Sequence, residues 1–190
     1  KDFNIKTYDF RSTHLYFDGW VLAVPPIWHI PFAFEALEHG SHCFVEKPIS
    51  NTLDRLDELI ASYERAKLTL MVGYQLRLNE RLKEVKDIVM SNEYGKLLSL
   101  QANYGYYLPY WHHKENYHKL YTGHKSEGGG ITFDASHELD YVNWIVGSKI
   151  IDIKSTLSKQ SNLDIDVEDT VDIILKFENN VQANIHLDMI

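Results

Sequence analysis

WVLAVP, at residues 20–25, is a short apolar run that ends at a proline pair, as a buried strand does when a turn follows it. Two apolar runs of the same kind come later, HCFVE at residues 42–46 and LTLMVGY at residues 68–74. The segments between them show helical spacing. Because parallel neighbouring strands need a crossover, which is usually a helix, the pattern predicts half of a doubly wound parallel sheet.

The two predicted crossover helices have recognisable ends. The first begins near Ile27, repeats apolar residues at Ile30, Phe34 and Leu37, and reaches Gly40, a residue suited to a left-handed helix end. The second runs to about residue 67, and we expect Asn51 or Thr52 to cap its start.

The pattern changes after residue 76. A helix is predicted over residues 80–91, and strands over residues 97–107, 150–158, 169–177 and 181–189. The pair Asn179-Asn180 tolerates positive φ and predicts a hairpin. We therefore expect an α/β fold. A partial Rossmann-type parallel sheet (residues 1–76) should precede an α+β domain with a mainly antiparallel open sheet (residues 77–190).

Composition narrows the choice of partners. The chain has 190 residues, 44% of them hydrophobic, and a formal net charge of −8 with both signs interspersed. This pattern gives no basic patch for nucleic acid or an anionic membrane, and no apolar run is long enough to cross a bilayer. The single cysteine, Cys43, cannot form an internal disulfide. We expect a cytoplasmic protein with a small polar partner.

One candidate site lies where the three predicted parallel strands end. Glu46-Lys47-Pro48 follows the second strand, VPPIWH ends the first and VGYQLR ends the third. The carboxyl ends of parallel strands are where open α/β sheets bind ligands. Charged residues after a strand are more often merely solvated loop residues, so the convergence of three strand ends carries the prediction.

A second candidate is GGGITFDASHELD at residues 128–140. The glycines permit close approach of a ligand or a helix. Asp134 and His137 are three residues apart, so on one helix the carboxylate could orient the imidazole. The alternative is that Asp134 only caps a helix with a buried apolar face, and Asp140 is expected to face solvent or pack against a helix.

Taken in order, these motifs resemble the Gfo/Idh/MocA family of oxidoreductases along nearly the whole chain. The resemblance rests on VLAVPP with a following histidine, then FVEKP, VGYQLR, GGG with D…H…D, and VEDTVDIILKFENN. It implies an N-terminal Rossmann domain that binds NAD or NADP and a second domain that shapes the substrate site. It also implies a homo-oligomer that acts on a sugar-like substrate, assembling through residues 97–107 and 150–189.

The resemblance assigns roles to individual residues. The resemblance implies that the catalytic residues are Lys47, His137 and Asp134. It implies cofactor contacts for Pro25, Pro26, His29, Glu46 and Lys47, and substrate contacts for Arg77, Trp111 and His137. Hydride would pass between a hydroxyl-bearing carbon and the nicotinamide. Either Lys47 takes the hydroxyl proton, or it stays charged and stabilises the alkoxide while His137 accepts the proton.

Two departures from the family pattern matter. The family commonly has three residues between the aspartate and the histidine, whereas only two separate Asp134 from His137, so the transfer rests more on His137. The family's glycine-rich G-x-G-x-x-G turn is absent, and its members continue beyond Ile190. We therefore expect an internal fragment, with an apolar edge exposed along residues 20–25.

Two rival hypotheses belong to other classes. The histidines at positions 112, 113, 118 and 124 could bind a metal, but their spacing matches no closed ligand set, and we expect no metal site. The other rival is a non-catalytic fragment, or a binding or scaffold homologue that keeps the fold. The presence of both Lys47 and His137 argues against it.

Overall fold

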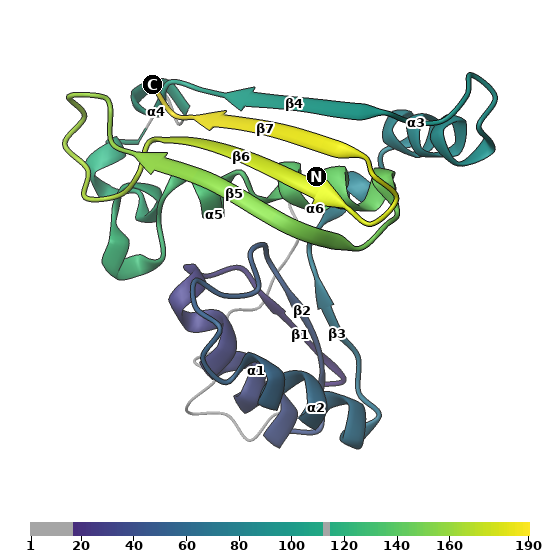
Figure 1. Ribbon diagram of the computed structural model, residues 1–190. Coiled ribbons are helices and arrows are strands. Elements are labelled where there is room, and N and C mark those ends of the chain that lie inside the picture. Colours follow the sequence, from purple (N-terminus) through teal and green to yellow (C-terminus); the bar gives the residue numbers. More distant parts are fainter. Residues whose placement is uncertain (1–16, 112–114) are drawn as a thin grey trace, which may run out of the picture.

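A computed structural model describes residues 17–111 and 115–190 of the chain. Its strands form two separate sheets, a three-stranded sheet with the order β1-β2-β3 and a four-stranded sheet with the order β4-β7-β6-β5. Figure 1 shows the four-stranded sheet as one layer with α5 and α6 beneath it, on the side that faces the smaller sheet. The helices α5 and α6 thus lie between the two sheets.

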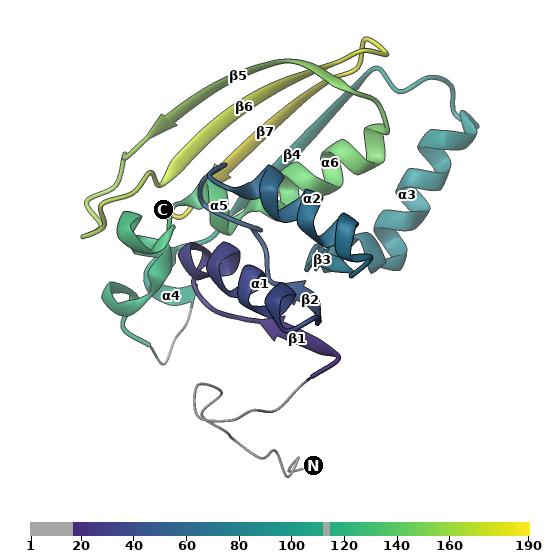
Figure 2. The same cartoon turned by 90° about the horizontal axis from the view of Figure 1, so that it is seen from below.

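The three-stranded sheet is parallel throughout, as the sequence predicts. Its strands are β1 (Gly19–Leu22), β2 (His42–Val45) and β3 (Leu70–Val72). They lie in chain order, and right-handed crossovers then place both connecting helices on one face. These helices, α1 (His29–Glu38) and α2 (Leu56–Ala66), lie side by side in Figure 2, and the hydroxyl of Tyr63 on α2 donates to the Ala33 carbonyl on α1 at 2.8 Å.

The predicted cap of the second helix is wrong. Helix α2 begins at Leu56, after Arg55 in the left-handed region with a φ of 56°. The hydroxyl of Thr52 instead accepts from the Asp54 amide within a preceding turn, at 3.3 Å. Hydroxyl side chains compete for nearby backbone amides in this way, so a capping residue in the sequence can serve a turn rather than a helix.

The edge strand β1 carries apolar surface that the other described residues, 23–111 and 115–190, leave uncovered. Val21 is 73% exposed, and an apolar hollow of about 330 Å³ lies along this strand. Its lining includes Phe17, Trp20, Leu22 and Phe32. The prediction of an apolar edge along residues 20–25 agrees with this exposure.

The four-stranded sheet is mixed. It consists of β4 (Ser99–Gly105), β5 (Ile150–Ser158), β6 (Thr170–Phe177) and β7 (Gln182–Asp188). The pairs β5–β6 and β6–β7 are antiparallel, and Asn180 takes a φ of 67° in the hairpin predicted between the last two. Strand β4 pairs with β7 in parallel, so the sheet is mainly antiparallel, as expected from the sequence, with one parallel pair. The chain inserts α4 (Leu108–Trp111), short 3-10 turns, α5 (Ile131–Asp134) and α6 (Ser136–Val146) between β4 and β5.

Each sheet has its own core. One face of the four-stranded sheet is buried at alternate positions, including Val171, Ile173 and Leu175 of β6, because successive strand residues point to opposite faces. Helix α6 contributes Val142 and Val146 to this core.

The 3-10 segment Gln75–Leu78 connects the parallel sheet to α3 (Glu80–Ser91), which Asn79 caps by accepting from the Arg81 amide at 2.9 Å.

In the part of the chain that the structure describes, no helix is long and apolar enough to cross a membrane.

Candidate functional site

Lys47 lies directly after β2, at the carboxyl edge of the parallel sheet. The neighbouring strand end is held beside it by His29, which is 1% exposed. One ring nitrogen of His29 lies 2.7 Å from the Pro48 carbonyl oxygen and the other lies 2.8 Å from the Val24 carbonyl oxygen. Both ring nitrogens therefore contact the backbone, and His29 ties the end of the first strand to the loop that carries Lys47.

The Lys47 side chain reaches across to the second half of the chain. Its ammonium group donates to the main-chain carbonyl of Asp134 and lies 3.5 Å from the carboxylate oxygen Oδ1 of the same residue. The two side chains are only 16% and 13% exposed. The structure thus brings together two predicted catalytic residues that are 87 positions apart.

Asp134 is also held by a tyrosine, and a second tyrosine lies near it. Tyr106, just after β4, donates its hydroxyl to Oδ2, and the Asp134 charge also acts on the Tyr121 phenol. Burial raises the pKa of both phenols, and the neighbouring Asp134 charge raises it further. These two residues were not predicted as site residues, although the concentration of tyrosines between positions 104 and 121 was a signal for them.

His137 lies near Lys47 but is not oriented by Asp134, contrary to the sequence expectation. Helix α5 ends at Asp134, and α6 begins at Ser136 after a break at Ala135, so the two residues do not share a continuous helix. The Nδ1 atom of His137 is buried without a hydrogen-bond partner among the described residues, and the ring packs edge-on against Tyr74 with centroids 5.8 Å apart. Burial, together with the Lys47 charge, lowers the pKa of His137.

The alternative role of Asp134 as a helix cap is not what the structure shows. The residue before α6 is Ala135, and no side chain caps that helix. One turn further on, Glu138 is 6% exposed, and its burial raises the pKa of its carboxyl group. The Lys47 charge acts in the opposite direction and lowers the pKa of this group. Glu138 was not among the site residues predicted from the sequence.

The three glycines allow close approach of chain to chain. A Cβ atom at Gly129 would lie 2.3 Å from the Tyr121 carbonyl oxygen, and one at Gly128 would lie 2.9 Å from the Asn51 Cβ. Gly130, with a φ of 113°, has the Glu168 carboxylate where its Cβ would be. Only glycine fits so closely against another segment, and the loop thereby packs against the parallel-sheet half near Pro26.

Arg77 and Asp140 form a bidentate ion pair instead of lying apart. The guanidinium donates to both carboxylate oxygens, at 2.8 Å and 2.6 Å, and the Asp140 side chain is 7% exposed. Asp140 was expected to face solvent or pack against a helix, and its ion pair corrects that expectation. A buried carboxylate needs a partner, which Arg77 supplies from the preceding 3-10 turn.

The other predicted contact residues surround this centre. Pro25 and Pro26 begin the 3-10 turn after β1, and the Lys47 amide lies 3.3 Å from a carboxylate oxygen of Glu46. Trp111, at the end of α4, is 46% exposed and packs against Tyr106 with ring centroids 4.5 Å apart. The Trp111 indole is therefore connected through Tyr106 to Asp134.

The histidine-rich segment gives no metal site in the residues that can be assessed. The histidines at positions 112 and 113 lie outside the described residues. Nε2 of His124 lies 2.7 Å from the His118 carbonyl oxygen, and His118 itself lies 3.5 Å from Asp164. No group of three or more metal-binding side chains occurs within residues 17–111 and 115–190.

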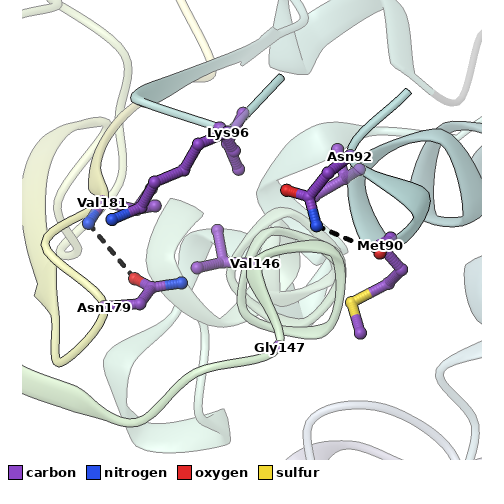
Figure 3. A pocket seen from close by; sticks show the side chains of 9 residues that line it. Met90, Asn92, Lys96, Val146, Gly147, Asn179 and Val181 are labelled. Atoms are coloured by element: carbon purple, nitrogen blue, oxygen red, sulfur yellow. Dashed lines mark hydrogen bonds between the residues drawn. The ribbon is translucent and has the colours of Figure 1, made fainter. Parts of the chain in front are cut away.

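The pocket in Figure 3 lies away from this centre. It has a volume of about 360 Å³, and its lining includes Met90, Asn92, Lys96, Gly147 and Asn179. Gly147 follows the last turn of α6, whereas His137 lies in its first turn. Since a helix rises about 1.5 Å per residue, the pocket is roughly 15 Å from His137 along α6. We place the candidate active site at Lys47, Asp134 and His137, where charged and titratable groups converge.

Known oxidoreductases are similar to this chain over most of its length. An uncharacterized oxidoreductase, YrbE, of Bacillus subtilis (strain 168) is 30% identical over 170 residues, and inositol 2-dehydrogenase of Corynebacterium glutamicum is 26% identical over 176 residues. These matches cover 87% and 90% of the chain but only 47% and 48% of the relatives, so the chain spans about half their length. A crystal structure of an NAD-binding protein from Listeria innocua, 26% identical, superposes with a TM-score of 0.75 over 90% of the chain and 48% of that protein.

Two family descriptions cover the two halves. The oxidoreductase family with an NAD-binding Rossmann fold matches residues 9–74, and the GFO/IDH/MocA C-terminal domain matches residues 82–190. Together they take in both sheets and every residue of the centre around Lys47. The resemblance stated from the motifs is confirmed, and the chain belongs to the GFO/IDH/MocA oxidoreductase family.

Proposed function

We propose that this chain carries the nicotinamide end of the active site of an NAD(P)-dependent oxidoreductase, which moves a hydride to or from a hydroxyl-bearing carbon of a sugar or cyclitol. The observation that carries the proposal is the contact between Lys47, near the end of a parallel strand, and Asp134, at the end of α5 just before the helix that bears His137. Ligands of open α/β sheets bind at such strand ends.

The residues at this point fit a nicotinamide cofactor in charge and position. When bound, that cofactor takes up or supplies the hydride. Lys47 contributes an ammonium group fixed at Asp134, and Pro25, Pro26 and Glu46 flank it at the same edge of the sheet. His29 contributes by holding the two strand ends together, because both of its ring nitrogens already contact backbone carbonyls.

His137 is the proton acceptor in this proposal. Its lowered pKa keeps the imidazole neutral near pH 7, and a neutral imidazole can take a proton from a hydroxyl group. Lys47 keeps its proton and stabilises the negative charge that develops on the substrate oxygen. This assignment favours the second of the two mechanisms that the sequence left open, because Lys47 Nζ already donates to an Asp134 oxygen.

A ring-shaped polyol is the substrate class that the surroundings favour. The inositol dehydrogenase relative is named for a cyclitol. Beside Asp134, the tilted ring pair of Tyr106 and Trp111 offers an apolar surface next to a charged group. Aromatic faces adjoining hydrogen-bonding groups suit ligands with both apolar faces and hydroxyl edges. We also propose self-association through the second sheet, over residues 97–107 and 150–189.

The test is hydride transfer itself. The chain is incubated with NAD or NADP and a panel of cyclitols and aldoses, and formation of the reduced nicotinamide is followed by absorbance. We expect Lys47→Ala and His137→Asn to lower turnover by at least about a hundredfold while cofactor affinity changes much less. Binding of nicotinamide without any turnover across the panel would favour the non-catalytic binding protein instead.

A further inference from the structure

The distance between Lys47 and the Asp134 carboxylate is long for two partly buried, oppositely charged groups. The ammonium lies 3.5 Å from Oδ1, whereas charge-assisted bonds of this kind usually measure about 2.7–2.9 Å. The ammonium is within reach of this residue, since it donates to the Asp134 main-chain carbonyl. Some other interaction must therefore keep the carboxylate from turning fully toward the lysine.

Tyr106 supplies that interaction, and Tyr121 lies near the same carboxylate. Tyr106 donates to Oδ2 from the end of β4, and the Asp134 charge acts on the Tyr121 phenol, in the 3-10 turn Tyr121–Gly123, and raises its pKa. A carboxylate accepts only a limited number of donors in fixed directions, and the direction taken by the Tyr106 hydroxyl is not available to the ammonium.

We propose that Tyr106, with Tyr121 near it, is a positioning residue that turns the Asp134 carboxylate away from Lys47, so that the ammonium is held mainly by a backbone carbonyl and stays free to donate to the substrate oxygen. A backbone carbonyl carries no net charge, and it fixes the position of Nζ while holding it less strongly than a close carboxylate does. The ring of Tyr106 also packs on Trp111, a proposed substrate-contacting residue. The residue that positions the Asp134 carboxylate therefore also contacts the proposed substrate site.

The inference deepens the proposed function and rests on it for the role of Lys47. Its test, however, needs neither cofactor nor substrate. Trace acylation with acetic anhydride, followed by peptide mass spectrometry, measures the reactivity of each lysine in the folded chain. Failure of this test would overturn the positioning role alone, whereas failure of the hydride assay would overturn the proposed function and leave the acylation result standing.

In Tyr106→Phe, the freed carboxylate should close on the ammonium. We expect the acylation rate of Lys47 at pH 8 to fall by about threefold to tenfold, since closer pairing favours the unreactive charged form. Tyr104→Phe is the matched control, because Tyr104 lies two residues earlier on β4, and its ring contacts Tyr106 with centroids 5.8 Å apart. Its rate should equal that of the unaltered chain.

A second comparison separates positioning from general loosening. In an Asp134→Asn background the carboxylate charge is gone, so adding Tyr106→Phe should no longer slow the acylation of Lys47. If Tyr106 only packs the site, its loss would expose Lys47 and raise its rate, with or without the carboxylate. A raised or unchanged rate in Tyr106→Phe, or a fall that persists in the Asp134→Asn background, overturns the proposal.

Discussion

The guanidinium of Arg77 donates to both carboxylate oxygens of Asp140. These bonds join the end of the parallel-sheet half to helix α6 of the second half. Arg77 is 46% exposed at its side chain, whereas Asp140 is 7% exposed. The pair lies one helical turn after His137. It therefore fixes the helix that carries a proposed catalytic group against the sheet that carries Lys47.

Removing the arginine should destabilise the fold. Arg77→Ala leaves the Asp140 carboxylate buried without its partner, and we expect a loss of about 1–3 kcal/mol in the free energy of unfolding, after discounting for the exposed arginine. Arg77→Lys should restore only part of this, because an ammonium cannot form the bidentate pair. Urea unfolding measures both. If Arg77→Ala has normal stability, the Arg77–Asp140 ion pair does not stabilise the fold. That result would favour a role of Arg77 in binding substrate.

The pKa of His137 should respond to Lys47. Burial lowers this pKa and the Lys47 charge lowers it further, so Lys47→Met should raise it, with NMR titration of the imidazole as the measurement. Lys83→Met, on the exposed face of α3, is the control and should leave it unchanged. No upward shift would mean that the two proposed catalytic groups do not interact.

The same shift makes stability depend on pH. Because the folded-state pKa of His137 lies below the reference value of 6.5, the unfolded chain binds more protons between the two values. Stability should therefore fall as pH decreases through that interval. His137→Gln removes this contribution, and its loss of stability between pH 7 and pH 5 should be smaller than that of the unaltered chain, as followed by urea midpoints.

Gly129 should tolerate no side chain. A Cβ there would lie 2.3 Å and 2.5 Å from the carbonyl oxygens of Tyr121 and Thr122, and backbone atoms cannot give way cheaply. We expect Gly129→Ala to cost more than about 3 kcal/mol of unfolding free energy. Gly40→Ala is the matched control. It has a φ of 69° but nothing within 4 Å, so it should cost only the left-handed strain of about 1–2 kcal/mol.

Strand β5 should take part in self-association. It is an edge strand with apolar side chains left uncovered, Ile153 at 60% and Leu157 at 53% exposure. Exposed apolar edges of this kind pair readily with another chain. Sedimentation should detect species larger than a monomer, and Ile153→Lys should weaken their formation at least about tenfold. Leu53→Lys, at an 85% exposed position in the other half, is the control. A monomer at every concentration would contradict the prediction.

Local sequence predicted most of the elements correctly. The period of the apolar residues located the parallel strands, and Asn179-Asn180 located the last hairpin, because both signals arise within a few residues. The parallel pairing of β4 with β7 was missed, since about 80 residues separate Ser99 from its partner Gln182 and nothing local encodes that register. The cap at Thr52 failed because a turn and a helix start present the same residue types.

The sequence by itself determined that Lys47 follows a buried parallel strand and that His137 belongs to a glycine-led helical segment, because strand ends and helix starts are written in short-range patterns. Only the tertiary structure decided which carboxylate pairs with which cation. In the folded chain Asp134 lies beside Lys47 and the two tyrosines, and Asp140 pairs with Arg77. Hydrogen bonds form only between groups a few ångströms apart. The packing of the two sheets and the helices between them decides which distant residues come that close, so it also decides the pairing.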